Sequence, residues 1–128
     1  MLFWKKKKKI LIIEDNEDLV IFLKKILESE GYTVFSVTRG EGAIDLAIAN
    51  KPDVILLDIL LPDIPGAEVE RLLKEAPPTR NIPIVYMTAL VSREDEENSK
   101  RPESTRLLLA KPVTKDRLLQ AIRSAVAK

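Results

Sequence analysis

Residues 53–62 read DVILLDILLP, and this stretch decides the fold. Residues 54–57 form an uninterrupted apolar run, which is typical of a strand buried on both faces in the middle of a parallel sheet. Asp58 follows directly, although an unpaired charge is among the costliest groups to bury. The stretch therefore predicts a central strand that delivers a carboxylate to a sheet edge, where other groups offset its charge.

Short apolar runs at residues 10–13, 84–87 and 107–109 predict three more strands, and the alternating residues 32–37 predict a fourth. Apolar residues at helical spacing fill the intervals. The first helix is capped by Asn16 and the last by Thr114. The predicted stripes are Leu19, Phe22, Leu23, Ile26 and Leu27; Ala43, Leu46 and Ala47; Val69, Leu72, Leu73 and Ala76; and Leu118, Leu119, Ile122 and Val126. Alternating strands and helices predict an α/β fold of three layers, a parallel sheet with helices on both faces.

One segment breaks this alternation. Residues 92–106 read SREDEENSKRPESTR and contain no aliphatic or aromatic residue, so they cannot present an apolar stripe to the sheet. We expect a mobile loop, or at most a solvated turn of helix over residues 94–100 that Pro102 breaks. The fourth helix is accordingly predicted to be short, irregular or missing.

The composition narrows the chemistry. The chain has 128 residues, 45% hydrophobic and 32% charged, as expected for one soluble globular domain. It has no cysteine, which excludes disulfides and thiolate catalysis and fits a reducing compartment, so we expect a cytoplasmic location. It has no histidine, the usual general base at neutral pH. No apolar run approaches the roughly 20 residues of a membrane span, and a net charge of +1 predicts no nucleic-acid partner.

A basic leader precedes the first strand. Residues 5–9 are five consecutive lysines after Met1-Leu2-Phe3-Trp4. Such a segment can contact an anionic surface or nucleic acid, or anchor at a membrane surface. The interpretation we favour is a solvated leader that keeps the first strand soluble, because no apolar stretch of signal-peptide length is present. We therefore assign residues 1–8 to the leader and residues 9–128 to the domain.

Chemically useful side chains follow the predicted strands. In an open parallel sheet, ligands bind outside the carboxyl ends of the strands. The residues at those positions are Glu14-Asp15, Asp58, Thr88-Ala89 and Lys111-Pro112. Three carboxylates would repel one another unless a cation lay among them, and an all-oxygen set suits Mg²⁺. A hydroxyl and an ammonium could hold phosphoryl oxygens while a carboxylate acts as nucleophile, forming an aspartyl phosphate.

These residues and their surroundings resemble the receiver domain of two-component response regulators, the CheY-like family. The resemblance rests on ILIIEDN (residues 10–16), DVILLDILLPDIPG (53–66), IPIVYMTA (82–89) and LLLAKP (107–112), in this order and at these intervals. It implies a five-stranded sheet in the order 2-1-3-4-5.

The resemblance also implies roles for single residues. Asp58 would accept the phosphoryl group, and Asp15 and Asp58 would bind Mg²⁺ together with the backbone carbonyl of Leu60. Glu14 would act mainly through water. Thr88 and Lys111 would hold the phosphoryl oxygens. Ala89 and Pro112 would belong to the switching loops, with a cis Lys111-Pro112 peptide.

Function follows from the same resemblance. Because the chain lacks histidine, the phosphohistidine donor would be another protein, a sensor histidine kinase or a histidine phosphotransfer protein. The domain would catalyse only its own phosphorylation and dephosphorylation, and it would switch a surface that binds an unknown downstream protein.

Three departures from the family pattern carry expectations of their own. Leu108 occupies a position that usually holds an aromatic switch residue, which puts an aromatic rotamer switch in doubt. The polar segment 92–106 replaces an apolar helix of the usual partner surface. Leu60 and Leu90 border the path of the hydrolysing water, and neither side chain can orient a water molecule, so we expect slow autodephosphorylation.

Two other functions compete with this one. A pseudo-receiver would keep the fold and bind a partner without phosphorylation, which the irregular fourth helix favours and the complete set of acids, Thr88 and Lys111 disfavours. A phosphohydrolase of the haloacid dehalogenase type would need an acid two residues after its nucleophile, where this chain has Leu60.

Overall fold

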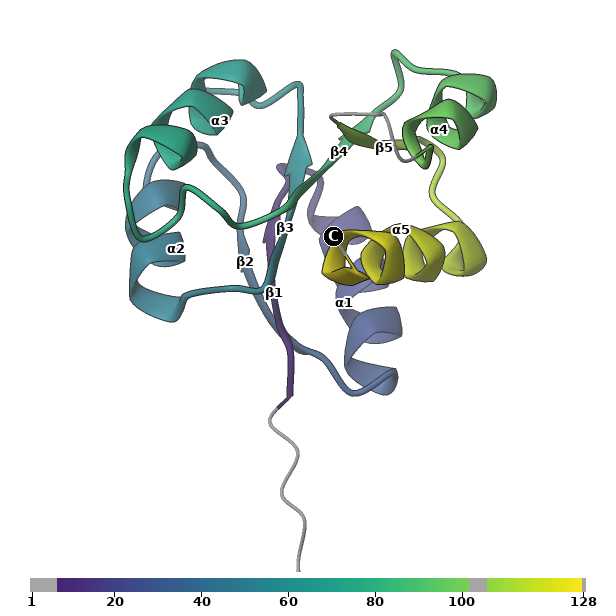
Figure 1. Ribbon diagram of the computed structural model, residues 1–128, viewed down its shortest axis with the longest axis horizontal. Coiled ribbons are helices and arrows are strands. Elements are labelled where there is room, and N and C mark those ends of the chain that lie inside the picture. The colour runs from purple at the N-terminus through teal and green to yellow at the C-terminus, as the bar shows by residue number, and fades with distance from the viewer. Residues whose placement is uncertain (1–6, 102–105, 128) are drawn as a thin grey trace, which may run out of the picture.

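Five strands alternate with five helices along the chain (Figure 1). The computed structural model describes residues 7–101 and 106–127. The strands are β1 (Lys9–Ile13), β2 (Thr33–Val37), β3 (Val54–Asp58), β4 (Ile84–Thr88) and β5 (Leu107–Ala110). The helices are α1 (Glu17–Ser29), α2 (Ala43–Asn50), α3 (Gly66–Glu75), α4 (Arg93–Ser99) and α5 (Lys115–Ala127). Residues 1–6 of the expected leader, and Pro102, at which we expected a break, lie outside the described residues.

All five strands are parallel and lie in the order β2-β1-β3-β4-β5, as predicted. β3 is central, and β5 is an edge strand. In register, Asp58 lies opposite Met87, and Thr88 lies opposite Ala110. The carboxyl ends of β1, β3, β4 and β5 therefore meet at one edge of the sheet.

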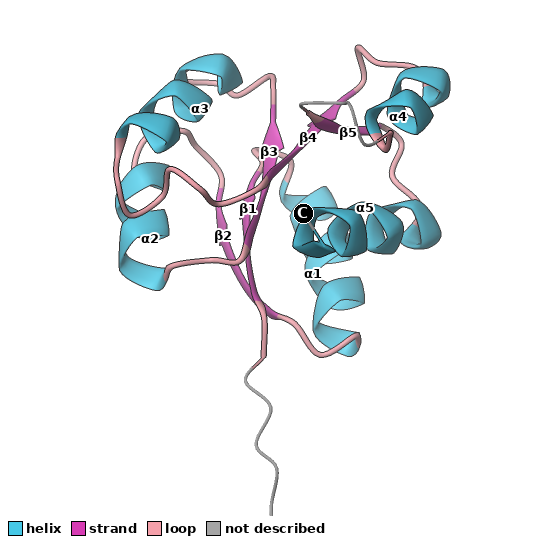
Figure 2. Cartoon of the chain, in the orientation of Figure 1, coloured by secondary structure: helices cyan, strands magenta, loops and turns pink. Residues whose placement is uncertain are grey.

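The sheet separates two apolar cores, which explains the uninterrupted apolar runs. Alternate residues of each central strand face opposite sides. Ile10, Ile12 and Leu56 pack on one side with α1 and α5. Leu11 and Leu57 pack on the other side with α2 and α3 (Figure 2). Because both faces are covered, every residue of β3 is buried.

Two predicted helix faces need correction. Phe22 of α1 is 42% exposed, and Val20 is buried instead. Val126 of α5 is 40% exposed, whereas Ala121 and Ala125 are buried. Only the residues directly over the sheet are covered, and small alanines allow α5 to approach it closely. The predicted caps are confirmed: Asn16 Oδ1 accepts from Leu19 N (3.1 Å), and Thr114 Oγ1 accepts from Arg117 N (3.4 Å).

α4 is short, as predicted, but it is not the solvated segment we expected. Ser92 caps it in a capping box with Asp95. Glu96 and Ser99 are buried, at 1% and 4% exposure. They lie against the edge of β5, where an edge strand leaves alternate backbone groups unpaired. Polar side chains can satisfy those groups, so α4 packs without an apolar stripe.

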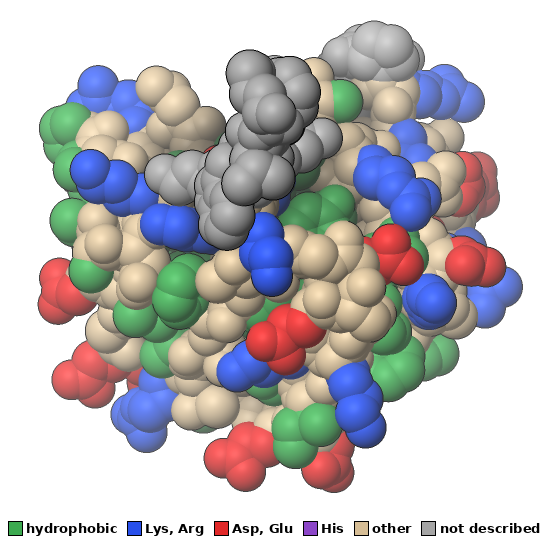
Figure 3. All heavy atoms as spheres, turned by 90° about the horizontal axis from the view of Figure 1, so that it is seen from below, with side chains coloured by type: hydrophobic (Ala, Val, Ile, Leu, Met, Phe, Trp, Pro, Cys, Tyr) green, Lys and Arg blue, Asp and Glu red, His purple; other side chains and the backbone are tan. Residues whose placement is uncertain are grey.

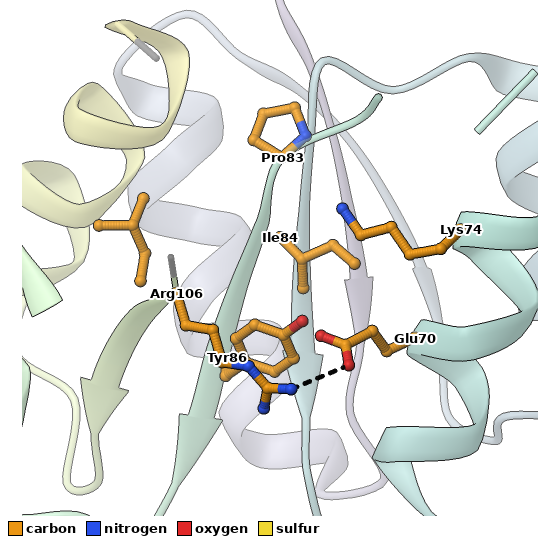
Figure 4. A pocket seen from close by; sticks show the side chains of 7 residues that line it. Glu70, Lys74, Pro83, Ile84, Tyr86 and Arg106 are labelled. Carbon is orange, nitrogen blue, oxygen red and sulfur yellow. Dashed lines mark hydrogen bonds and ion pairs between the residues drawn. The ribbon is translucent and has the colours of Figure 1, made fainter. Parts of the chain in front are cut away.

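A pocket of about 280 Å³ lies between α3 and the beginnings of β4 and β5 (Figure 4). Arg106 crosses it: its guanidinium lies 5.3 Å from the centre of the Tyr86 ring, and its Nη2 lies 3.3 Å from Glu70 Oε1. The arginine covers Tyr86 on the side of the sheet that faces α3.

The surface at the amino ends of the strands is mixed in charge. Seen from below, the coloured side chains include both Lys or Arg and Asp or Glu, with no broad area of one sign (Figure 3). Of the helices in the part of the chain that the structure describes, none is long and apolar enough to cross a membrane.

Candidate functional site

Three carboxylates converge at the carboxyl edge of the sheet. Glu14 and Asp15 follow β1, and Asp58 ends the neighbouring strand β3. One oxygen from each lies within 4.8 Å of the others. Glu14 and Asp58 are buried, whereas Asp15 is exposed. Strand order alone brings these acids together, because parallel neighbours end at the same edge.

Lys111 neutralises part of this negative charge. It follows β5, and its Nζ lies 2.7 Å from Glu14 Oε1 and 3.2 Å from Asp58 Oδ2. Burial would lower the pKa of Lys111, but the hydrogen bond and charge of Glu14, together with the charge of Asp58, outweigh it and raise the pKa. Lys111 is therefore held as an ammonium beside Asp58, which explains how that carboxylate can be buried.

The negative charge of the Glu14 carboxylate is less well compensated by its surroundings. Burial raises its pKa to about 7, with Asp58 and Asp15 adding to the effect, against the lowering by Lys111 and by the backbone N–H of Asn16. Its Oε2 accepts from Asn16 N (3.1 Å), whereas Oε1 has the Lys111 ammonium at 2.7 Å and no other partner among the described residues. Among the described residues, Lys111 pairs with Glu14 and Asp58, and no ion pair reaches Asp15. The cluster of three acids is therefore short of positive charge and fits a divalent cation.

Asp58 and Thr88 shape the loops that follow their strands in the same way. Asp58 Oδ1 accepts from Leu60 N (3.0 Å), and Thr88 Oγ1 accepts from Leu90 N (3.1 Å). Each bond turns the chain so that the leucine side chain points outward. Leu60 is 57% exposed, Leu90 is 73% exposed, and Ala89 is also exposed. The mouth of the site therefore carries apolar side chains.

Gly66 fixes how closely α3 approaches the site. A Cβ at this position would lie 2.8 Å from the carbonyl oxygen of Asp58 and 2.7 Å from Ile59 Cα, closer than real Cβ atoms come. The N–H of Gly66 donates to Ile59 O (2.9 Å). Only glycine lets the loop after β3 fold back onto the backbone of Asp58.

Asp63 is a supporting residue that our sequence analysis missed. Its two carboxylate oxygens accept from Gly40 N (2.8 Å) and Glu41 N (2.7 Å), which joins the loop after β3 to the loop after β2. Burial would raise its pKa, but these amides outweigh it and lower the pKa. An Asp among prolines indicates a turn, yet its partners are 22 and 23 residues away, and no local pattern shows them.

The expected switch positions Leu108 and Pro112 lie before and after Lys111 in the chain. The Lys111-Pro112 peptide is cis, as predicted. Leu108 is half-buried, and its N–H donates to Ser99 Oγ of α4 (3.0 Å). Its neighbour in register on β4 is Tyr86, a buried aromatic. An aromatic side chain thus lies on the neighbouring strand rather than at position 108.

Comparisons with known proteins agree with this geometry. The sequence pattern of the response regulator receiver domain matches residues 10–123. The chain is 35% identical over 117 residues to the polar-differentiation response regulator DivK of Brucella anthropi, covering 91% of this chain and 94% of DivK.

Solved structures are similar in the same way. The receiver domain of sensor histidine kinase PA1611 from Pseudomonas aeruginosa, with a magnesium ion coordinated in its active-site cleft, matches with a TM-score of 0.81 and 28% identity, over 96% of this chain and 100% of that one. The signal receiver domain of a signal transduction histidine kinase from Syntrophus aciditrophicus matches at 0.76 and 30%, over 94% and 90%. The chain belongs to the response regulator receiver domain family and is a phosphoacceptor module of two-component signalling.

Proposed function

We propose that Asp58 is the phosphoacceptor and that its donor is a phosphohistidine on a sensor histidine kinase or a histidine phosphotransfer protein. The observation that carries this assignment is a buried carboxylate held 3.2 Å from a lysine ammonium inside a cluster of acidic oxygens. A receiver domain is not a conventional enzyme, and turnover of outside substrates is not expected.

The reaction is a transfer between two side chains. An oxygen of the Asp58 carboxylate attacks phosphorus, the P–N bond to the donor imidazole breaks, and the histidine leaves with that electron pair. An acyl phosphate forms on Asp58. The protein contributes positioning and positive charge, which are the main means of catalysis for phosphoryl transfer.

Lys111 and Thr88 are suited to hold the transferred group. The ammonium of Lys111 already lies beside Asp58, so it can pair with the new phosphoryl charge. The Thr88 hydroxyl accepts from Leu90 N, which leaves its O–H free to donate to a phosphoryl oxygen. Ala89 and Pro112 lie beside these two residues and would move with them.

A Mg²⁺ ion completes the proposed site. Asp15, Asp58 and the backbone carbonyl of Leu60 would hold it, with Glu14 acting mainly through water. The excess of acids over lysine supports this set. The ion would supply the positive charge that draws phosphoryl oxygens toward Asp58.

Leu60 and Leu90 are the residues proposed to set the lifetime of the phosphoryl group. Both are exposed at the mouth of the site, and neither offers a hydrogen bond to an attacking water. We expect slow autodephosphorylation and a shorter half-life in Leu60→Asn. An unchanged half-life in that variant would remove the proposed role of Leu60.

The organisation of the chain is part of the same proposal. Residues 9–128 form the receiver domain, and residues 1–8 precede it as a basic leader. The absence of cysteine supports a cytoplasmic location.

A small phosphodonor with Mg²⁺ tests the assignment. We expect one acid-stable, base-labile phosphoryl group per chain, lost in Asp58→Asn and on removal of Mg²⁺ by a chelator. Asp53→Asn is the matched control, because Asp53 precedes the same strand at the opposite sheet edge, where it accepts from Lys9 N (2.7 Å).

The other outcomes separate the competing functions. A native chain that takes no label would contradict the proposal and favour a pseudo-receiver. Many turnovers of the donor per chain would instead point to a phosphohydrolase.

A further inference from the structure

Arg117 of α5 forms hydrogen bonds to the backbone on both sides of Lys111. Its Nη2 donates to Ala110 O (2.8 Å), and its Nη1 donates to Pro112 O (2.9 Å). Lys111 lies between these two carbonyls in the chain. A planar guanidinium can span two acceptors in one fixed geometry, which a single ammonium cannot do.

Glu96 of α4 holds this arginine from the other side. Its Oε2 accepts from Arg117 Nε (3.0 Å), and its Oε1 accepts from Arg117 Nη2 (2.5 Å). The Glu96 side chain is 2% exposed and that of Arg117 is 16% exposed. Burial would raise the pKa of Glu96, but Arg117 and the Ala110 amide outweigh it and lower the pKa, so the pair is ionic.

The same carboxylate also binds the strand. Glu96 Oε1 accepts from Ala110 N (2.9 Å), while Lys111 N donates to Thr88 O (3.1 Å) on the opposite side of the strand. Both polar backbone groups of Ala110, together with the carbonyl of Pro112, are thus bound by one charged pair. Charge-assisted bonds of this kind are short and directional, so they define position more closely than apolar contact does.

Lys111 lies on the segment that this charged pair holds. Of the cationic side chains in residues 7–101 and 106–127, it is the one that ion pairs with both Glu14 and Asp58. Its side chain begins on a segment at the end of an edge strand, which has a neighbouring strand on one side only. Among the described residues, Arg117 and Glu96 supply the side-chain hydrogen bonds that hold the outer side of this segment.

We propose that Arg117 is a positioning residue for phosphoryl transfer: through the carbonyls of Ala110 and Pro112, and held by Glu96, it fixes Lys111 toward Asp58. This inference rests on the function proposed above. It also ties α4 to the site, because the carboxylate that orients Arg117 belongs to that helix. A movement of Lys111 toward a phosphoryl group is then transmitted to α4 through the strand end and Glu96.

Labelling rates of arginine variants test the proposal. In the full chain with a small phosphodonor and saturating Mg²⁺, we expect Arg117→Gln to be phosphorylated at least about tenfold more slowly, because misplacement of a charged group by about an ångström has effects of this order or larger. Arg117→Lys, which can reach one carbonyl at a time, should fall between Arg117→Gln and the native chain. Arg123→Gln, an exposed position on the same helix, should label at the native rate.

Rates are compared at a temperature at which circular dichroism shows every variant to be folded. If Arg117→Gln is folded and labels at the native rate, Arg117 is only a structural brace and the proposal fails. If Arg117→Gln does not fold, Glu96→Gln decides, since it keeps the size of the side chain and removes the charge that orients Arg117. Slower labelling of Glu96→Gln supports the proposal, and a native rate overturns it. A native chain that takes no label contradicts the proposed function instead.

Discussion

α3 and α4 show two different ways of attaching a helix to the same sheet. α3 buries Val69 and Leu73, which are four residues apart, in the apolar core on one face. α4 buries Glu96 and Ser99, which are three residues apart, against the free edge of β5. Both spacings place two side chains on one side of a helix. In each helix, the type of the two buried side chains therefore matches the surface they contact. Apolar side chains of α3 meet the apolar core, and polar side chains of α4 meet the unpaired backbone groups of β5.

The difference affects what each helix can do. Apolar burial stabilises by about 25 cal/mol per Å² and has little directional preference. Side-chain bonds to an edge strand add little net stability, but they hold one geometry and leave unsatisfied groups when a partner is lost. α4 is accordingly attached by a few specific bonds, and its position is sensitive to single partners and to protonation.

Leu73→Ala should give the largest loss of stability, and it tests the apolar half of this comparison. Leu73 is fully buried, and we expect its truncation to cost about 3 to 5 kcal/mol of unfolding free energy, from lost burial and a residual cavity. Urea denaturation measures the change. Leu72→Ala, a half-buried position on the same helix, is the control and should cost clearly less.

Glu96→Ala tests the polar half. It leaves Arg117 and the amide of Ala110 without their carboxylate, and breaking a fully buried ion pair costs about 3 to 5 kcal/mol. Because the Arg117 side chain is 16% exposed and can recruit water, we expect about 2 to 3 kcal/mol here. Denaturation of Glu97→Ala, an exposed position on α4, provides the reference. Equal stability of the two variants would show that α4 is not held by Glu96.

Acid should weaken the attachment of α4 to the sheet. The pKa of Glu96 in the folded chain lies below its usual value of 4.5, so its ionised form contributes stability that is complete above about pH 4.5. This contribution is lost as the pH falls from 4.5 through the lower folded value. Glu96→Gln, with no charge to lose, should be less stable than the native chain by a constant amount above about pH 5, and this gap should narrow in acid. A gap that does not change with pH would contradict the ionic role.

Ser99→Ala should have a smaller effect. Its Oγ accepts from Leu108 N (3.0 Å) and donates to Glu96 O (2.6 Å). Loss of the acceptor for one edge amide should cost about 1 kcal/mol. Hydrogen exchange should locate the change at the Leu108 amide, which would exchange faster while the Leu109 amide stays protected. Unchanged exchange at Leu108 would mean that the bond is not maintained in solution.

Arg71→Ala should have the smallest effect. Arg71 pairs with Glu68 and Glu75 on the outer face of α3, and its side chain is 55% exposed. Solvent screens such pairs, so the change in unfolding free energy should stay below about 1 kcal/mol. Thermal denaturation in low and high salt checks this. A loss as large as that of Glu96→Ala would erase the distinction between exposed and buried ion pairs on which the comparison rests.

Much of the site could be predicted because it follows local patterns. Several side chains of the site each follow an apolar run: the acids after β1 and β3, Thr88 and Lys111. Parallel pairing of the strands then places these side chains at one edge of the sheet. The environment of Glu96 could not be predicted in this way. Its neighbours in the sequence are polar, so the pattern predicts a solvated face, and the groups that bury it are 14 and 21 residues away.

The sequence by itself determined the parallel sheet, the central position of residues 54–57 and the set of groups at the carboxyl edge. Apolar periodicity records which surface of each segment must leave water, and that requirement is local. Only the tertiary structure decided that α4 lies at the edge of β5, that Glu96 and Arg117 pair, and that this pair holds the backbone around Lys111. A buried charge is tolerated only where donors from distant segments meet it, and that meeting exists only once the chain has folded.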